Sequence, residues 1–130
     1  MKAHSPDTVT MQCPAATQNA SLVRSVAATL AVRADLTLDQ VEDVRLAVDE
    51  AFSYLVTHAS TDSVITCNLG ADRRRFSAEM SCTTTAMTTP DPDPFSWMVL
   101  TALVPDVAFD LQNGTLTLTW TFAADQSVTA

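Results

Sequence analysis

Residues 38–59 read LDQVEDVRLAVDEAFSYLVTHA, and this stretch decides the fold. It is a long run without glycine or proline, and its apolar residues recur at three- and four-residue steps, the spacing that places side chains on one face of a helix. This face consists of Val41, Val44, Val48, Ala51, Leu55 and Ala59. Thr37 and Gln40 have the spacing of a capping box, which satisfies backbone groups where a helix begins. We therefore predict a helix over residues 38–59.

A strand and a helix are predicted ahead of this element. Residues 7–13, DTVTMQC, alternate in the manner of a short strand, and Pro14 ends it. Residues 17–34 follow a helical period, and their stripe consists of Leu22, Val26, Leu30 and Ala34, widened by Val23 and Ala27. The candidates for the N-cap are Thr17, Asn19 and Ser21. Because only residues 34–36 separate the two helices, we expect the helices to pack against each other.

After residue 59 the apolar period changes to that of strands. Residues 63–69 and 75–82 are predicted as an antiparallel pair joined by a turn at 70–74, and one face of the second strand carries Phe76, Ala78 and Met80. Residues 83–94, TTTAMTTPDPDP, have the composition of a loop. Residues 95–104, FSWMVLTALV, are predicted to form a short apolar helix.

Pro94 suits the first turn of that helix, because a proline lacks only an N–H that is unpaired there in any case. Asn113 and Gly114 form a dipeptide typical of a two-residue hairpin turn. It joins strands predicted at 106–111 and 115–122. The second strand alternates throughout, and its core face consists of Leu116, Leu118, Trp120 and Phe122.

The predicted order of elements is β-α-α-β-β-α-β-β. Antiparallel strands with helices collected on one side define an α+β fold, here a two-layer α/β sandwich. We expect residues 1–130 to form a single domain with its core at about 7–122, and a frayed tail from Ala123.

The net charge of the chain is −8. This balance argues against direct nucleic-acid binding, for which a basic face is needed. It fits a basic partner, and it equally fits acidity that only keeps the protein soluble. No apolar run approaches the length of about 18 residues that a membrane span needs, and the first residues lack the apolar region of a signal peptide. We therefore expect no membrane partner and a cytoplasmic location.

Cys13, Cys67 and Cys82 are odd in number and widely spaced, and no CxxC motif occurs. This favours reduced, buried thiols over a disulfide framework or a zinc site, with a redox switch as the alternative.

Glu50 is the carboxylate with the clearest catalytic potential in the pattern. It stands beside Asp49 and four residues before Tyr54. A carboxylate at the edge of a cleft can act as a general base, whereas the simpler interpretation is a solvated helix face. His58 shares the face of Glu50, where it either meets Glu50 through Tyr54 or complements the helix terminus.

Basic and aromatic residues gather at two other places. The residues 73–75 are all arginine, which favours either a charged hairpin turn or a site for phosphate or an acidic partner. Phe95 and Trp97 cannot easily both face the core, so we expect one at an interface. Gly70 and Gly114 are the only glycines, and both are assigned to hairpin turns, so no glycine-rich phosphate loop is present.

The stretch LAVDEAFSYLVTHA resembles the N-box helix of the histidine-kinase-like (Bergerat-fold) ATPases, and more narrowly that of small anti-sigma factors that are also serine kinases. The segment TQNASLVR, with Asn19, Ser21 and Arg24, is similar to the corresponding place in members of sporulation and stress response. The segment FSWMVLTALVPDV resembles a divergent anti-sigma-F branch of high-GC bacteria. The resemblance covers about residues 7–122 and implies the Bergerat fold.

By this resemblance Glu50 matches the family's general base, and Tyr54 stands where the family has the asparagine that ligates Mg²⁺. A phenol is a poor ligand for a hard cation. The adenine-binding D-x-G-x-G box falls on residues that lack its aspartate and both glycines, among them Cys82, Thr84 and Ala86. The phosphate-binding G-x-G falls at Pro94 and Ser96, where a proline and Cβ atoms obstruct phosphates.

The resemblance thus implies a degenerate ATP site, with no cofactor or metal and Glu50 as a vestige of catalysis. The function it implies is an anti-sigma factor, homodimeric, that sequesters an alternative sigma factor and is released by an anti-anti-sigma (STAS-type) antagonist. Arg24, with Asn19 and Ser21, is expected to contact these partners. One alternative is an ATP- and Mg²⁺-dependent serine-protein kinase that retains Glu50 and acts on the anti-anti-sigma factor. A second is an orphan α+β module that binds a small ligand in the vacated cleft.

Overall fold

The computed structural model describes residues 7–124, so most of the tail predicted to fray lies outside the described residues. Its elements are β1 (Asp7–Pro14), a 3-10 turn (Thr17–Asn19), α1 (Ala20–Arg33), α2 (Leu38–His58), β2 (Val64–Ala71), β3 (Arg75–Thr83), α3 (Pro94–Leu103), β4 (Ala108–Gln112) and β5 (Thr115–Ala123). This is the predicted order of strands and helices.

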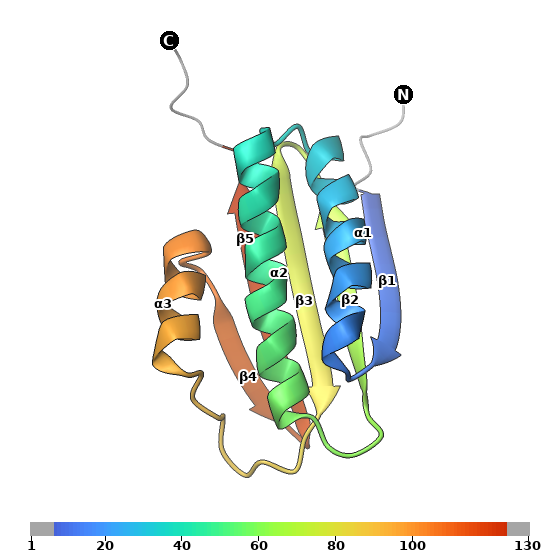
Figure 1. The fold of residues 1–130 in the computed structure, drawn as a ribbon, viewed down its shortest axis with the longest axis vertical. Helices are drawn as coiled ribbons and strands as arrows, with labels where there is room; N and C mark the ends of the chain where they lie inside the picture. Colours follow the sequence, from blue (N-terminus) through green and yellow to red (C-terminus); the bar gives the residue numbers. More distant parts are fainter. Residues whose placement is uncertain (1–6, 125–130) are drawn as a thin grey trace.

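The strands form one antiparallel sheet in the order β1-β2-β3-β5-β4. Figure 1 shows α1 and α2 side by side over one face of this sheet, with α3 beyond α2, next to β4. The two-layer α+β sandwich is confirmed, and so is the packing of α1 against α2. None of the helices in residues 7–124 has the length and apolar character to cross a membrane.

The beginning of α2 is fixed by the predicted capping box. The Thr37 hydroxyl accepts a hydrogen bond from the Gln40 backbone N–H, with 3.2 Å between oxygen and nitrogen. The Gln40 side chain in turn accepts from the Thr37 N–H at 2.9 Å. The predicted apolar face is buried, and it consists of Val41, Val44, Val48, Ala51 and Leu55. Its last member, Ala59, is the C-cap, because the helix ends at His58.

The apolar face predicted for α1 is confirmed in part, because Val23, Ala27, Leu30 and Ala34 are buried. Leu22 is exposed and Val26 is only half-buried. The buried residues of the helix are Val23, Ala27, Leu30 and Ala31. Leu22 and Val26 fit the same helical spacing as the buried residues, so periodicity alone cannot separate them. The buried set places alanines toward its neighbours, and small side chains let α1 approach α2 closely.

None of the predicted N-cap side chains caps α1. Asn19 occupies the N-cap position, but its side-chain amide donates to the Pro14 carbonyl oxygen at 2.9 Å. The Ser21 hydroxyl donates to the Gln18 carbonyl oxygen at 3.1 Å. The 3-10 turn at Thr17–Asn19 carries the chain into the helix, so the start of α1 rests on backbone hydrogen bonds.

The core face of the sheet follows the predicted alternation. Phe76, Ala78 and Met80 are buried on β3, and Leu116, Leu118 and Trp120 are buried on β5. Phe122 is only half-buried, close to the end of β5. The hairpin turn is confirmed as well, because Asn113 and Gly114 both have positive φ, 53° and 77°.

The assignment of Gly70 to a hairpin turn was wrong. Gly70 lies inside β2 and pairs with Ser77, whose hydroxyl would lie 3.0 Å from an added Cβ atom. The turn is made instead by Arg73 and Arg74, which adopt positive φ of 52° and 67°. Backbone hydrogen bonds in both directions between Asp72 and Arg75 close this turn.

Candidate site at the junction of the central and third helices

The predicted catalytic position lies where α2 meets α3. The Ser96 hydroxyl donates to the Glu50 carboxylate, with 2.6 Å between the oxygens. The same hydroxyl lies 2.9 Å from Oδ2 of Asp93. A serine has one hydroxyl proton, so the two carboxylates compete for it. Glu50 is thus engaged by a side chain of its own protein.

Asp93 explains why α3 begins at this place. Its Oδ1 accepts hydrogen bonds from the backbone N–H groups of Phe95 and Ser96, at 2.9 and 3.2 Å. Pro94 occupies the first turn, as predicted. The N–H and hydroxyl of Ser96 lower the pKa of Asp93, so this cap stays ionised well below neutral pH.

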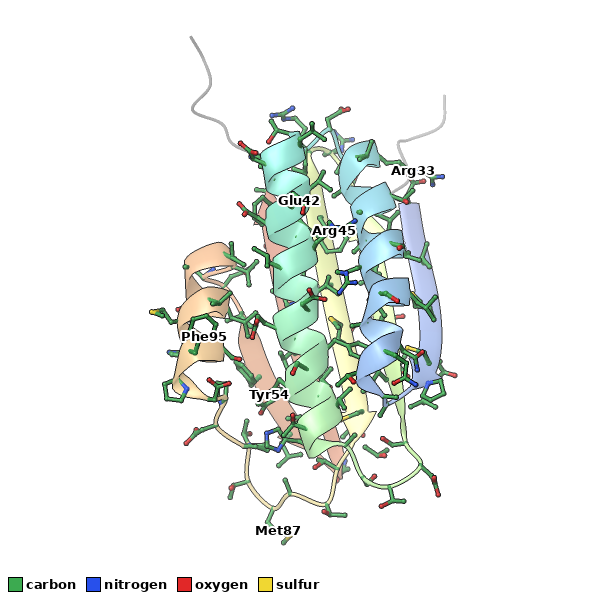
Figure 2. All side chains as sticks on the ribbon, viewed as in Figure 1. Arg33, Glu42, Arg45, Tyr54, Met87 and Phe95 are labelled. Carbon is green, nitrogen blue, oxygen red and sulfur yellow. The ribbon has the colours of Figure 1, made fainter. Side chains whose placement is uncertain are left out.

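Tyr54 lies one turn beyond Glu50 on α2 and holds the loop that leads to α3. Its hydroxyl donates to the carbonyl oxygen of Pro90. Its ring packs edge-on against Phe109, with 5.1 Å between the ring centroids. The imidazole of His58, on the next turn of α2, has its centroid 4.8 Å from that of the Tyr54 ring. His58 therefore contacts Tyr54 and also lies in the last turn of α2, so both interpretations predicted for it remain open. Figure 2 shows Tyr54 in the lower half of α2, with α3 beside it.

Burial raises the pKa of Tyr54 to about 12, with smaller contributions from Asp91 and Cys82. The phenol is therefore neutral at physiological pH. It acts as a hydrogen-bond donor to the loop, and it carries no charge with which to hold a cation.

Of the three residues predicted for the adenine box, Cys82 lies at the end of β3, and Thr84 and Ala86 lie at the start of the same loop. The Cys82 thiol donates weakly to the Leu55 carbonyl oxygen, with 3.7 Å between sulfur and oxygen. Thr84 is buried, its N–H donates to the Gly114 carbonyl oxygen at 2.9 Å, and its hydroxyl accepts from the Ala86 N–H at 3.1 Å. The polar atoms at this position are therefore paired within the protein.

Two hollows flank the loop. One, of about 290 Å³, is lined by Tyr54 and mainly by polar residues, namely Ser53, Thr57, His58, Asp91, Pro92, Asp93 and Ser96. The other, of about 480 Å³, is mainly apolar and is lined by Thr89, Pro90, Asp91, Pro92, Pro94, Trp97 and Phe109. Asp91 and Pro92 line both, so the loop lies between them. Glu50 lines neither hollow.

The predicted partner-binding residues lie on another part of the helical layer. Arg24, on α1, forms an ion pair with Asp49 on α2, with 2.7 Å between nitrogen and oxygen. Both side chains are about one third exposed, 31% and 36%. Asn19 and Ser21 lie at the start of α1 with the local hydrogen bonds described above. Asp49 thus holds the Arg24 guanidinium in place while leaving part of it open to solvent.

The cysteines are free and buried, as the sequence indicated. Burial raises the pKa of Cys13, and it raises those of Cys67 and Cys82 to about 12 and about 11, with Cys13 adding to the shift of Cys67. Thiols of this kind are poorly reactive at neutral pH. Within residues 7–124, no group of three or more potential metal ligands comes together.

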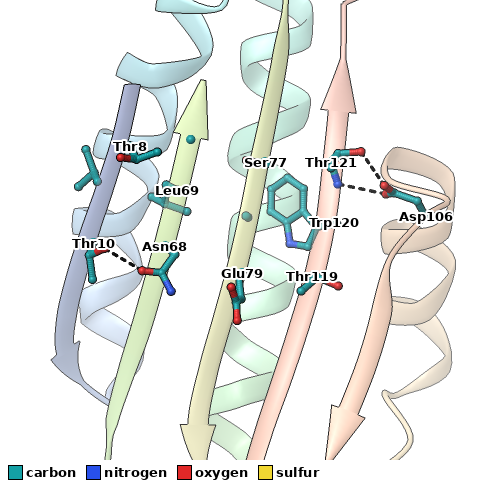
Figure 3. A pocket seen from close by; sticks show the side chains of 13 residues that line it. Thr8, Thr10, Asn68, Leu69, Ser77, Glu79, Asp106, Thr119, Trp120 and Thr121 are labelled. Carbon is teal, nitrogen blue, oxygen red and sulfur yellow. Dashed lines mark hydrogen bonds between the residues drawn. The ribbon is translucent and has the colours of Figure 1, made fainter. Parts of the chain in front are cut away.

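A further hollow, of about 510 Å³, lies on the sheet face opposite the helices (Figure 3). Its rim carries short polar side chains, and the hydrogen bonds of Thr10 with Asn68 and of Thr121 with Asp106 lie along it. None of the residues predicted for the site lines this hollow.

Sequence reasoning missed the residues that close the junction. Pro90, Asp93 and Phe109 had no assigned role, although an aspartate directly before a proline at a helix start is a recognisable N-cap signal. The contacts of Pro90 and Phe109 with Tyr54 join segments distant in sequence, so no local pattern announces them. Phe95 and Trp97 are both exposed, in agreement with the prediction that they cannot both face the core, and the interface expected for one of them stays a prediction.

Comparison with known proteins identifies the family of this chain. Residues 13–120 match the model of the histidine kinase-like ATPase domain, so the chain belongs to this family and the predicted Bergerat-type fold is confirmed. The chain is similar to the anti-sigma-F factor RsbW of two Mycobacterium tuberculosis strains, with 32% identity over 99 residues that cover 76% of this chain and 59% of the relative. It is also similar to the serine-protein kinase RsbW of Halalkalibacterium halodurans, with 37% identity over 59 residues, 45% of this chain and 36% of the relative. The chain therefore spans about 59% of the length of the mycobacterial relatives.

Proposed function

We propose that this protein is an anti-sigma factor that binds and sequesters an alternative sigma factor, and that an anti-anti-sigma antagonist of the STAS type releases it. The observation that carries the proposal is the 99-residue similarity to proteins named anti-sigma-F factor. On this proposal the chain works in the cytoplasm as a homodimer that contacts proteins and not nucleic acid. Its net charge of −8 suits a basic partner.

The proposed partner surface is centred on Arg24, with Asn19 and Ser21 at the start of α1. The ion pair with Asp49 restricts the guanidinium before a partner arrives, which lowers the entropy that binding must remove. Leu46 is 49% exposed one turn before Asp49 on α2, and it supplies apolar area beside the ion pair. A charged group next to exposed apolar surface is a common composition of protein interfaces.

We further propose that the protein has no kinase activity, because the junction fits a magnesium nucleotide poorly. The Tyr54 phenol, matched to the family's Mg²⁺ ligand, donates its proton to Pro90 and lies under the loop. Glu50 accepts a hydrogen bond from Ser96, so one of its carboxylate oxygens is already occupied by a donor of its own chain. Pro94 removes a backbone N–H where phosphates would need one.

Charge supports the same conclusion. Phosphoryl transfer depends on neutralising a polyphosphate with cations. The sequence from residue 76 to residue 130 contains no lysine, arginine or histidine. Around the junction stand Glu50, Asp91 and Asp93, which would repel a nucleoside triphosphate.

A second candidate function is an ATP-dependent serine-protein kinase acting on the anti-anti-sigma factor. It is favoured by the presence of Glu50 on α2 and by the similarity to a protein named serine-protein kinase. A third, a small-ligand module, has the apolar hollow of about 480 Å³ in its favour. Neither accounts for the engagement of both Glu50 and Tyr54 by their own chain.

Co-purification from the native cell tests the proposal. The tagged wild-type protein is expected to retain a sigma factor, identified by mass spectrometry, and the Arg24→Glu variant to retain much less of it. Leu38→Ser, at an exposed position at the start of α2, serves as the matched surface control. Recovery of no sigma factor with the wild-type protein, or equal recovery with Arg24→Glu, would contradict this assignment.

A further inference from the structure

The third helix is unusual for an acidic protein. Its ten residues, PFSWMVLTAL, include no charged residue, yet Leu100 is the only one of them that is buried. Phe95, Trp97 and Met98 are 64%, 44% and 59% exposed. Figure 2 shows Phe95 on this outer helix, on the far side of α2 from α1. An uncharged helix left largely in solvent marks an interaction surface.

The hollow of about 480 Å³ adjoins this helix and gives the surface a shape. Trp97 and Phe109 form its aromatic wall, with ring centroids 5.8 Å apart, and Pro90 and Pro92 of the loop also line it. Proline and aromatic rings present rigid apolar surface, which loses little side-chain entropy on binding. Such a hollow suits one large apolar anchor from a partner.

The charged residues at the amino end of α3 indicate which charge the partner carries around its apolar side chain. Asp91 lines the hollow and Asp93 caps α3, and the Glu50 carboxylate lies beside Ser96. The nearby imidazole of His58 lines the neighbouring hollow and makes a tilted ring contact with Tyr54. Arg75 lies at the other end of β5, where it reaches Thr121. The end of α3 that borders the hollow is therefore bounded by carboxylates.

We propose that the surface formed by Phe95, Trp97, Met98 and the adjoining hollow, here termed the α3 surface, docks a basic amphipathic segment of a partner protein. An apolar side chain of that segment fills the hollow, and lysine or arginine one or two turns away meets Asp91 and Asp93. The complementarity of an apolar centre and an acidic edge selects this partner. A second copy of this chain would bring like charges together, and an anionic membrane surface would be repelled in the same way.

The α3 surface is distinct from the one centred on Arg24, because α2 separates α1 from α3 (Figure 1). The inference therefore goes beyond the proposed function and does not depend on it. A protein that failed to bind a sigma factor through α1 would still dock a basic segment on α3.

The test uses a synthetic amphipathic peptide of leucine and lysine at helical spacing, and a matched peptide with glutamate in place of lysine. Trp97 is exposed and Trp120 is buried, so a change of intrinsic fluorescence reports on the α3 surface. We expect saturable binding of the lysine peptide that weakens as salt rises, and no binding of the glutamate peptide. Backbone amide shifts should be confined to the loop at 84–93, α3 and β4.

Substitutions test which side chains of the α3 surface contribute to the affinity for the lysine peptide. Phe95→Ser combined with Met98→Ser should raise the Kd at least about tenfold by calorimetry, since these two side chains are the large exposed apolar groups that α3 adds beside the hollow. Asp91→Asn should raise the Kd about two- to threefold and reduce its dependence on salt. The matched controls are Leu38→Ser for lost apolar area and Asp35→Asn for lost charge, and both should leave the Kd unchanged. Unchanged thermal unfolding of the α3 variants shows that the fold is kept, since both substituted side chains are exposed.

Three results would overturn the inference. Equal binding of the two peptides, or shifts centred on α1, would show that the α3 surface does not select a basic segment. An unchanged Kd in the Phe95 and Met98 double variant would remove the apolar centre. Sedimentation equilibrium gives the third, since a dimer that the double variant converts to a monomer would assign the surface to a second copy of this chain.

Discussion

The hydroxyl of Ser96 lies 2.6 Å from a carboxylate oxygen of Glu50, and this contact joins the third helix to the central one. It pairs a half-buried carboxylate with a donor from a segment 46 residues further along the chain. The position that resembles a catalytic base is therefore also a point of contact between α2 and α3. The contribution of this contact can be measured as a change in the free energy of unfolding.

Ser96→Ala should lower the free energy of unfolding by about 1–2 kcal/mol, because it leaves the Glu50 carboxylate without its donor. Urea unfolding followed by circular dichroism measures the change. Ser53→Ala, at an exposed position on α2, is the matched control and should have little effect. Equal stability of Ser96→Ala and the wild-type protein would mean that this contact does not hold α3.

Tyr54→Phe removes the hydroxyl that donates to the Pro90 carbonyl and keeps the ring packed against Phe109. We expect a loss of about 1 kcal/mol in the free energy of unfolding, since the carbonyl can recover part of the bond with water. Hydrogen exchange should show faster exchange of amides in the loop at 84–93. Unaltered exchange there would contradict the role of Tyr54 in holding the loop.

Alkaline pH should destabilise the wild-type protein more than the Tyr54→Phe variant. Burial raises the pKa of Tyr54 from about 10 to about 12, so the folded state keeps the proton more tightly than the unfolded state. Its contribution to stability is fully present below pH 10 and is lost as pH rises toward 12. Cys67 and Cys82 titrate in the same region, and comparison of the two proteins removes their common contribution. If the stability of the wild-type protein and that of Tyr54→Phe fell in parallel as pH rises, the raised pKa of Tyr54 would be contradicted.

Much of this architecture could be predicted from the sequence because its signals are local. The capping box at Thr37 and the hairpin dipeptide at Asn113 are fixed by residues within one turn of each other. Which residues of the predicted face of α1 are exposed could not be predicted, since the exposed Leu22 and the buried Val23 both fit a helical period. Tertiary packing of small residues against α2 decides between them.

The candidate site was likewise predictable only where its signals are local. Glu50 and Tyr54 could be located on one helix by their spacing, but their partners could not. Ser96 and Pro90 reach them across long intervals of sequence, and only the folded chain brings these segments together. Arg73 and Arg74 lie within the turn predicted at 70–74, but their positive φ angles could not be predicted, since arginine seldom adopts this conformation.

The ion pair of Arg24 and Asp49 allows binding and folding to be separated in the proposed partner surface. Arg24→Glu places two carboxylates together, so some of its effect on binding could arise through stability. The charge-swapped variant, Arg24→Glu with Asp49→Arg, should regain stability to within about 0.5 kcal/mol while sigma-factor binding stays weak. Denaturant unfolding and pull-down on the same samples measure both. Recovery of binding together with stability would show that the ion pair, and not Arg24 itself, is what the partner needs.

The central claim is that side chains of this protein fill the place where its family holds a magnesium nucleotide. Isothermal titration of ATP with Mg²⁺ into the wild-type protein tests it most directly, with ATP in the presence of EDTA as the control. We predict no saturable heat up to millimolar nucleotide. Binding in the micromolar range that requires Mg²⁺ would contradict the claim and favour the kinase.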